Sequence, residues 1–385
     1  MGARQDRLSV TRADSEVQSA AERTSPWQDP TRNVLLLPAV LIVLFLSLFP
    51  LILSLLTSLS RIRFVRGGFE VTFVGLLNYE KLLLGSEQRH FLGRFGDLSP
   101  VAWVVLLVLW ALLLYALFRY LASTRLTVGG LIWRLATVVI LAWFAWLGVN
   151  TLTGEGLPGT LVVTLIFVWV GVALQYLLGL GLALLVTQNL PGRRLFRVIF
   201  LLPMMITPVG IGFLFRMITD TLKGPFSPVW IALGLSDLSW IDTGHGARTA
   251  VLIGDIWQWT PFMFIILLAA LEGVPTEPIE AALVDGANRL QLFRYIILPH
   301  IIPVSTTVIL IRLIEAFKII DMPQVLTQGG PGTATESITL HAYNLWRALD
   351  LGTSSALAYL LLFVSTFFAL VFVNIIRRRL LETLI

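Results

Sequence analysis

The chain has 385 residues, of which 56% are hydrophobic and only 13% are charged, with a net charge of +5. Soluble domains keep about a quarter of their residues charged, so this composition predicts a chain that lies largely in lipid. The absence of cysteine excludes disulfides, thiolate metal ligands and cysteine nucleophiles. The four histidines (His90, His245, His300 and His341) show no metal-ligand spacing. The positive charge is expected at membrane surfaces rather than on nucleic acid, because arginines cluster beside apolar runs.

Residues 1–33 are expected to form a disordered cytoplasmic tail, because they carry mixed charges and no apolar core of a cleavable signal. A bilayer core of about 30 Å needs roughly 20 apolar residues per helix. On that measure the sequence predicts spans near residues 34–58, 101–121, 131–150, 160–187, 195–215, 250–271, 300–320 and 351–376. The expected fold class is an all-α polytopic membrane protein with about eight transmembrane helices.

The distribution of basic residues predicts the orientation of these spans. The loop at 150–160 contains no lysine or arginine, whereas both flanking loops and the tail at 377–379 contain several arginines. Both termini are therefore expected in the cytoplasm. The segment 61–100 argues against this orientation, because it is placed outside yet holds six basic residues. Loops of that length often cross the membrane despite their charge, so the other signals prevail.

A polar gap between two apolar runs contains Glu280-Ala281-Ala282-Leu283-Val284-Asp285-Gly286, followed after nine residues by Ile296-Ile297-Leu298-Pro299. Ile279, Ala282, Leu283 and Gly286 follow the i, i+3, i+4, i+7 spacing of one apolar helix face. An amphipathic helix lying on the membrane is one interpretation, but such helices favour Lys and Arg on the polar face. This one begins acidic and contains a glycine, which favours docking of a partner.

The pattern of Glu-Ala-Ala, three residues, Gly, nine residues and Ile-x-Leu-Pro closely resembles the coupling-loop motif of ABC importer permeases. Residues 73–79 (FVGLLNY) are similar to the Phe-x-Gly-Leu-x-Asn-Tyr sequence of sugar permeases, and residues 326–332 (LTQGGPG) to their outer Leu-Thr-x-Gly-Gly-Pro-Gly loop. Over 34–79 and about 160–380 the chain resembles permease subunits of type I ABC importers, of the maltose-type (MalF-like) carbohydrate permease family.

The resemblance implies a domain organisation. We expect a first core transmembrane helix at 34–60, an extracytoplasmic segment at 61–100, an inserted transmembrane hairpin at 101–155, and a permease core at 156–380 with a cytoplasmic coupling loop at 272–299. Most relatives have six spans, so the hairpin is an addition between the family's first and second. Its sequence predicts a lipid-facing periphery and gives no function.

The resemblance also assigns roles to residues. Coupling to the ATPase is expected from Glu280, Ala281, Ala282, Asp285, Gly286, Leu298 and Pro299, and contact with the binding protein from Gly329, Gly330 and Pro331. The expected substrate pathway comprises Gln258, Trp259, Phe262, Arg312, Glu315, Ala316 and Ile319. Charges at membrane depth are rare and face a bundle interior or a wet cavity. Arg312 therefore either pairs with Glu315 as a structural element or lines the cavity.

No Gly-x-x-x-x-Gly-Lys-Ser/Thr sequence occurs, so this chain is not expected to hydrolyse ATP or to be an enzyme. No catalytic residue, metal or cofactor is expected here; ATP and Mg²⁺ belong to a partner. The implied partners are a second permease subunit, two ATP-binding subunits, an extracytoplasmic solute-binding protein and membrane lipid. The expected location is a bacterial or archaeal plasma membrane.

The expected function is import of a sugar or oligosaccharide by alternating access. One alternative is import of another polar solute, such as a glycerol phosphate, a polyol or an acidic sugar, by the same machinery. An ion-coupled secondary transporter is a less favoured alternative, because it would need intramembrane acidic relays and paired inverted repeats. A polytopic membrane enzyme would need a His/Asp/Glu constellation at one membrane face, which the sequence does not indicate.

Overall fold

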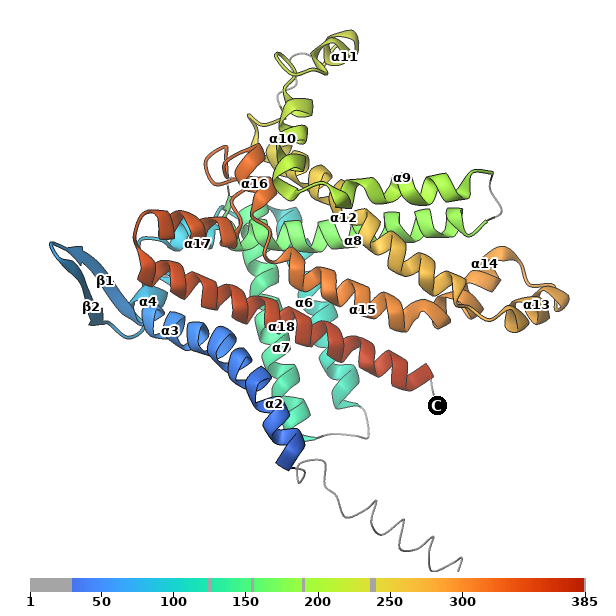
Figure 1. Ribbon diagram of the computed structural model, residues 1–385, viewed down its shortest axis with the longest axis horizontal. Helices are drawn as coiled ribbons and strands as arrows, with labels where there is room; N and C mark the ends of the chain where they lie inside the picture. Colours follow the sequence, from blue (N-terminus) through green and yellow to red (C-terminus); the bar gives the residue numbers. More distant parts are fainter. Residues whose placement is uncertain (1–29, 123–126, 154–155, 189–190, 236–239, 384–385) are drawn as a thin grey trace, which may run out of the picture. The chain divides into compact units, whose positions relative to one another are not determined.

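A computed structural model describes residues 30–122, 127–153, 156–188, 191–235 and 240–383 (Figure 1). The expected tail at 1–33 lies, up to residue 29, outside the described residues. The chain divides into two compact units, Met1–Thr57 and Ser58–Ile385. Within the described residues, seven helices are long and apolar enough to cross a membrane, or eight if one bent pair counts as a single span. The fold class expected from the sequence is thereby confirmed.

The described part of the first unit is one unbroken helical run, composed of α2 (Pro30–Val43), the π-helix η1 (Leu44–Leu48) and α3 (Phe49–Ser58), whose last residue is the first of the second unit. The wide turn η1 directly precedes Phe49 and Pro50, and Pro50 has no N–H to donate and a ring that would clash with the carbonyl four residues earlier. A π-turn gives that ring room without ending the helix.

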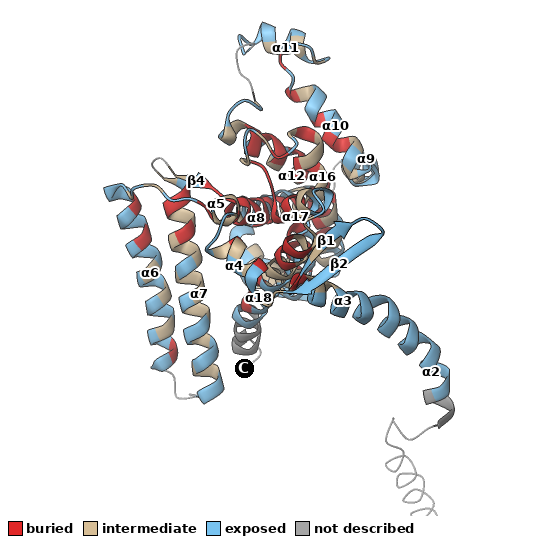
Figure 2. Ribbon diagram, turned by 90° about the vertical axis from the view of Figure 1, so that its left-hand side faces the viewer, coloured by how far each residue is buried: buried red, intermediate tan, exposed pale blue. Residues whose placement is uncertain are grey.

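The core of the second unit is built from four long helices. They are α8 (Thr160–Val186), α12 (Gly244–Glu272), α15 (Leu298–Ala316) and α18 (Leu351–Thr383). Figure 2 shows buried residues gathered along α8. Gly179 allows α8 to lie close against α12, because a Cβ there would come within 2.6 Å of the Met263 Cβ. The main apolar cluster joins residues of all four helices, including Val172, Leu267, Val308 and Leu357.

The expected fifth span at 195–215 is broken in two. Helix α9 (Arg193–Met205) and helix α10 (Pro208–Thr219) meet at a bend of 96°. Thr207 caps α10 by accepting from the Gly210 N–H at 3.3 Å, and Pro208 occupies its first turn, where a missing N–H costs little. Apolar composition alone does not predict this break, but the Thr-Pro pair is a recognisable helix-start signal.

The segment expected outside the membrane is structured. Strands β1 (Ser60–Val65) and β2 (Gly68–Phe73) form an antiparallel hairpin, followed by α4 (Leu77–Leu83), α5 (Gln88–Phe91) and β3 (Gly93–Arg94), which pairs with β4 (Leu157–Pro158). Asn78, from the expected FVGLLNY motif, donates to the carbonyls of Ser58 and Ser60 at 2.8 and 3.0 Å. This motif residue therefore has a structural role.

At the place of the expected inserted hairpin lie α6 (Pro100–Leu121) and α7 (Val128–Leu152), which pack along each other. The Trp110 indole donates to the Ala142 carbonyl at 3.2 Å across the pair. Phe144 on α7 packs on Phe368 of α18 with ring centroids 5.1 Å apart. The short helices α11 (Ser227–Ala232), α16 (Asp321–Leu326) and α17 (Ile338–Arg347) lie in the loops between the long helices.

Candidate functional site

The Glu-Ala-Ala sequence forms helix α13 (Thr276–Val284), which has no buried residue. Figure 1 shows α13 at the far ends of α12 and α15. Ile279 and Ala282 are half-buried, whereas Leu283 and Val284 are 56% and 88% exposed. The apolar stripe expected from the sequence is thus only partly covered by this chain. Exposed aliphatic side chains on a short protruding helix form a surface that a partner could cover.

Gly286 ends this helix in a Schellman motif. The Gly286 N–H donates to the Leu283 carbonyl at 3.1 Å, and the Ala287 N–H donates to the Ala282 carbonyl at 2.9 Å. Gly286 has φ of +79°, a left-handed conformation that costs other residues roughly 1–2 kcal/mol. A Cβ at Gly286 would meet nothing within 4 Å in this chain. The glycine is therefore needed here for the turn and not for packing within the chain.

The second half of the expected coupling loop at 272–299 is helical. Asn288 and Gln291 form a capping box that starts α14 (Arg289–Leu292), and the π-helix η2 (Phe293–Ile297) leads directly into α15. Leu298 and Pro299 are thus the first residues of α15 rather than loop residues. Pro299 follows a π-turn as Pro50 does, for the same steric reason. The motif therefore leads from α13 through a short turn into a helical run that continues into the membrane-length helix α15.

A buried ionic cluster lies between α8, α12 and α15. Arg312 on α15 is 2% exposed, and its Nε donates to the Gln175 Oε1 on α8 at 2.8 Å. Its Nη2 donates to both carboxylate oxygens of Asp255 on α12, at 3.0 and 2.8 Å. Gln175 Nε2 donates to the Asp255 Oδ2 at 2.8 Å, and the guanidinium carbon lies 4.6 Å from the Trp259 ring centroid. The cluster satisfies the charge of Arg312 within the chain.

The expected structural pair of Arg312 with Glu315 is wrong, because Arg312 pairs with Asp255 instead. Glu315 pairs instead with Lys318 at 2.8 Å, and both of these side chains are about half exposed or more. An unpaired Asp255 at membrane depth would be expensive, and the pair between helices removes that cost. Intrahelical spacing places Glu315 near Arg312, but the neighbouring helix supplies the nearer acid.

A small polar hollow of about 120 Å³ borders this cluster. It is lined by Pro208, Asp255, Gln258, Trp259, Arg312, Glu315, Lys318, Ile319, Ile320, Asp321 and Met322. Five of the seven expected pathway residues therefore meet here. The other two do not: Phe262 packs against the main apolar cluster, and Ala316 is buried in it. The hollow is smaller than the roughly 300–1,000 Å³ of typical ligand pockets.

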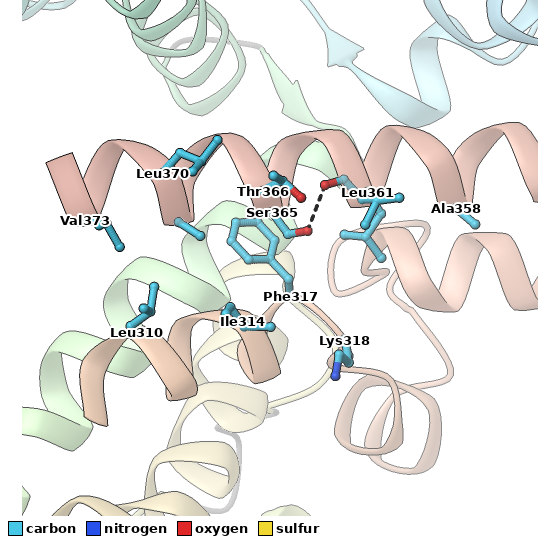
Figure 3. Close-up of a pocket in the computed structure, with 12 residues that line it drawn as sticks. Leu310, Ile314, Phe317, Lys318, Ala358, Leu361, Ser365, Thr366, Leu370 and Val373 are labelled. Carbon is cyan, nitrogen blue, oxygen red and sulfur yellow. Dashed lines mark hydrogen bonds between the residues drawn. The ribbon is translucent and has the colours of Figure 1, made fainter. Parts of the chain in front are cut away.

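A larger groove of about 460 Å³ runs between α15 and α18 (Figure 3). Aliphatic side chains and the Phe317 ring line it, with Lys318 at one end. The Ser365 hydroxyl in this groove donates to the Leu362 carbonyl of its own helix at 3.1 Å. Such a lining suits a lipid chain or an apolar helix better than a hydrated solute.

The expected loop at 326–332 is braced from within. The Thr335 hydroxyl lies 2.6 Å from that of Thr327 and donates to the Gly330 carbonyl at 3.0 Å. Gly329 is buried, Gly330 is half-buried, and Pro331 is exposed beside the exposed Gly332. The loop therefore presents a tip of fixed shape, of which Pro331 is part.

Two functional groups were missed from the sequence, Asp255 and Gln175. Asp255 is the one acidic residue in the run 250–271, and a lone acid inside an apolar span is a signal that could have identified it. Gln175 is a single amide within 160–186 and carries a weaker signal. Neither pattern identifies the partner, because which helices face each other is a property of the packed bundle.

Comparison with known proteins places these features in a wider group. The family described as "Binding-protein-dependent transport system inner membrane component" matches residues 175–382, which include Asp255, Arg312 and α13. The trehalose/maltose transport system permease protein MalF of Thermococcus litoralis is 36% identical over 217 residues, covering 56% of this chain and 74% of that protein. The trehalose transport system permease protein SugA of Mycobacterium tuberculosis is 32% identical over 227 residues, covering 56% and 68%.

A solved structure is also similar in fold. A chain of a bacterial alginate ABC transporter, crystallised with an alginate pentasaccharide-bound periplasmic protein, aligns with a TM-score of 0.52 at 20% identity. The alignment covers 71% of this chain and 95% of that one. At this identity the likeness concerns the arrangement of helices alone.

Proposed function

Because this chain belongs to the family of binding-protein-dependent transport system inner membrane components, we propose that it is one membrane-spanning subunit of an ABC importer for a neutral sugar or oligosaccharide. It is a transport subunit of the inner membrane and not an enzyme. The family removes the ion-coupled transporter and the membrane enzyme from the alternatives. The relatives named for trehalose and maltose transport support a sugar as the substrate.

The observation that carries the proposal is the exposed helix α13, which ends in the Schellman turn at Gly286. Without a phosphate-binding loop in the chain, the energy for transport has to come from elsewhere. An ATP-binding subunit that covers Leu283 and Val284 would move α13. Because Arg289–Ala316 is one continuous helix, the motion would be passed on to α15. The hollow beside Arg312 would move with that helix.

The chemistry of the hollow favours a neutral solute. Three carboxylates, from Asp255, Glu315 and Asp321, face it against two cations, from Arg312 and Lys318. The excess of carboxylates would repel a phosphate or an acidic sugar. Arg312 would not offset this repulsion, because it is already paired with Asp255. Trp259 offers an aromatic face to the C–H groups of a sugar ring. A second permease subunit would complete the site, since the hollow in this chain holds only about 120 Å³.

The remaining partners and the orientation follow from the same proposal. The tip at 328–332 would contact an extracytoplasmic solute-binding protein, and α13 would contact one of two ATP-binding subunits. Both termini would lie in the cytoplasm, with 272–288 on the same side. A second permease chain would pair with this one, and lipid would cover the outward apolar side chains of α6 and α7.

Uptake by the reconstituted complex tests the proposal. The chain is co-expressed with its neighbouring permease, ATPase and binding-protein genes, and ATP-dependent uptake of labelled trehalose, maltose and glycerol 3-phosphate is measured in proteoliposomes. Trp259→Leu should reduce sugar uptake by roughly tenfold, the equivalent of about 1.4 kcal/mol. Trp257→Leu is the matched control, because Trp257 lies on the same helix, packs against Phe215 and does not line the hollow. Preferential uptake of glycerol 3-phosphate would contradict the assignment of a neutral sugar.

A further inference from the structure

Two histidines far apart in the sequence stack on each other near the first turn of α8. His90 lies in α5 and His341 in α17, and their ring centroids are 3.8 Å apart with the planes inclined by 22°. Glu87, the residue before α5, and Glu336, just before α17, lie against them. Figure 2 labels α5 and α17 beside α8. His90 and His341 therefore lie together in the fold although the sequence shows no metal-ligand spacing between them.

The outer nitrogen of His90 is held by a carboxylate. Its Nε2 lies 2.7 Å from the Glu336 Oε2, and the Glu336 Oε1 accepts from the Asn344 side chain at 2.8 Å. With Nε2 donating to Glu336, the lone pair of the neutral ring is on Nδ1, which lies 3.7 Å from the Glu87 Oε2. A carboxylate behind an imidazole in this way is the usual support of a metal-binding histidine.

The His341 ring presents its Nε2 atom to the carboxylate of Glu87, which also lies near His90 Nδ1. His341 Nδ1 lies 3.4 Å from the Thr160 hydroxyl, whereas its Nε2 lies 3.9 Å from the Glu87 Oε2. His341 is 1% exposed, and its Nε2 has no hydrogen-bond partner among the residues that the structure describes. An unpartnered buried nitrogen is unusual and calls for an explanation.

We propose that Glu87 Oε2, His90 Nδ1 and His341 Nε2 form a binding site for a divalent transition metal ion, with zinc as the best fit. These three residues each offer a ligand atom, and the ligand atoms lie within 4.8 Å of one another. Two imidazoles and one carboxylate are a common ligand set for zinc, with bond lengths of about 2.0–2.2 Å and a fourth position left to water. The metal would draw the three atoms together and open the two stacked rings so that their lone pairs converge. Glu87 and His90 can follow, since their side chains are 26% and 31% exposed.

The site would join two parts of the chain that are far apart in sequence. Glu87 and His90 belong to the segment between the first helical run and α6, whereas His341 belongs to α17. Glu336, which supports His90, packs against Gly329, since a Cβ on that glycine would lie 3.4 Å from the Glu336 Cβ. A bound zinc would therefore clamp α5 to α17 and hold the loop at 326–332 in place. This inference does not depend on the proposed substrate.

Metal content of the purified protein tests the site. The full-length chain is purified in detergent with an affinity tag that contains no histidine, dialysed at about pH 8 against zinc and then against metal-free buffer, and analysed by mass spectrometry for retained zinc. We expect one zinc per chain in the wild type. Glu87→Gln and His90→Gln should each weaken zinc binding by at least roughly tenfold, and Glu336→Gln by about 10–100-fold. His300→Gln is the control, because His300 is exposed and lies outside the cluster.

X-ray absorption of the zinc-loaded wild type gives a second measurement that needs no variant. It should report nitrogen and oxygen ligands at about 2.0–2.2 Å, with two imidazoles in the outer-shell scattering. Zinc should also raise the thermal unfolding midpoint of the wild type and of His300→Gln but not that of His90→Gln. Absence of retained zinc in the wild type, or equal retention in Glu87→Gln, His90→Gln and His300→Gln, would overturn the proposal.

Discussion

Arg312 on α15 and Asp255 on α12 form a buried ion pair in which one guanidinium nitrogen donates to both carboxylate oxygens, at 3.0 and 2.8 Å. Both side chains are less than a tenth exposed. A charge at the centre of a membrane helix costs about 2.5–3.5 kcal/mol on insertion scales, so neither residue would be stable there without the other. The pair therefore fixes how α12 and α15 face each other, and it leaves Glu315 and Lys318 to face the hollow.

Removal of one member of this pair should destabilise the protein strongly. Arg312→Ala or Asp255→Ala leaves an uncompensated buried charge, which typically costs about 3–5 kcal/mol. We expect low yields of folded protein and a clear fall in the thermal unfolding midpoint in detergent. The double variant Asp255→Leu with Arg312→Met should recover most of that loss, although Gln175 Oε1 loses its hydrogen bond from Arg312.

Glu315→Ala is the matched control for the pair. It removes an exposed contact with Lys318, of a kind worth about 0.2–1 kcal/mol, and should leave the unfolding midpoint nearly unchanged. If Glu315→Ala, and not Asp255→Leu, restored stability to Arg312→Ala, the pairing between α12 and α15 would be wrong.

The membrane helices are predictable because roughly 20 apolar residues in a row leave few other structures possible. The bend between α9 and α10 is not predictable in this way, because the apolar run continues across it and only Thr207 and Pro208 signal a new helix start. Asp255 stands in an apolar span and could have been found. Its pairing with Arg312 could not, since a helix in isolation gives no information about which neighbour it faces.

Helix α13 is predictable from its motif, but the conformation of its glycine is predictable only in part. The sequence suggests both a bend and close approach by a partner at Gly286, and the structure shows the bend, as a left-handed residue that ends α13. His90 and His341 show the general limit most plainly. Their contact depends on α5 and α17 meeting beside α8, and no local spacing in the sequence encodes that meeting.

Substitutions at Gly286 should separate backbone conformation from partner contact. Asn tolerates left-handed φ values, so Gly286→Asn should retain a large part of transport if the turn is what matters. Gly286→Val should strain the turn by roughly 1–2 kcal/mol and displace α13, with loss of sugar uptake and of substrate-stimulated ATP hydrolysis. Membrane insertion should be unchanged in both variants, because Gly286 is exposed and a side chain there would touch nothing in the chain.

Gly148→Val provides the control for the added side chain. Gly148 lies in α7, has no positive φ, and a Cβ there would have no other atom within 4 Å, so transport should persist. Normal transport by Gly286→Val would contradict the assignment of α13 as the coupling helix. Equal loss in the Asn and Val variants would instead assign the effect to contact with the partner.

The orientation of the chain can be tested by single-cysteine labelling, because the natural sequence contains no cysteine. Asp285 and Pro331 are both exposed and lie at the two opposite faces that the proposal assigns. Pro331→Cys should react with a membrane-impermeant maleimide added to intact cells or spheroplasts. Asp285→Cys should react only after the membrane is opened. Labelling of Asp285→Cys from outside would reverse the proposed topology.

The pH dependence of stability should report the contact between α4 and the start of α18. Asp350 accepts from Lys81 Nζ at 2.6 Å, and from the Thr353 N–H at 3.2 Å as the cap of α18. Burial alone would raise the pKa of Asp350, but the hydrogen bonds from Lys81 and Thr353 outweigh it and lower that pKa. A lowered folded-state pKa means that the ionised carboxylate stabilises the fold above the unfolded-state pKa of about 3.9, and that this stability is lost as the pH falls through the folded value.

Asp350→Asn keeps a good helix cap and removes only the charge. Because the two side chains of the pair are about one third exposed, its loss should cost about 0.2–1 kcal/mol at pH 7. The thermal unfolding midpoint of Asp350→Asn should therefore lie below that of the wild type at neutral pH, and the two should converge below about pH 4. In Lys81→Met the added effect of Asp350→Asn should shrink, because the carboxylate has already lost its cation. If the unfolding midpoint of Asp350→Asn stayed below that of the wild type at low pH, the stabilisation by Asp350 would not come from its charge.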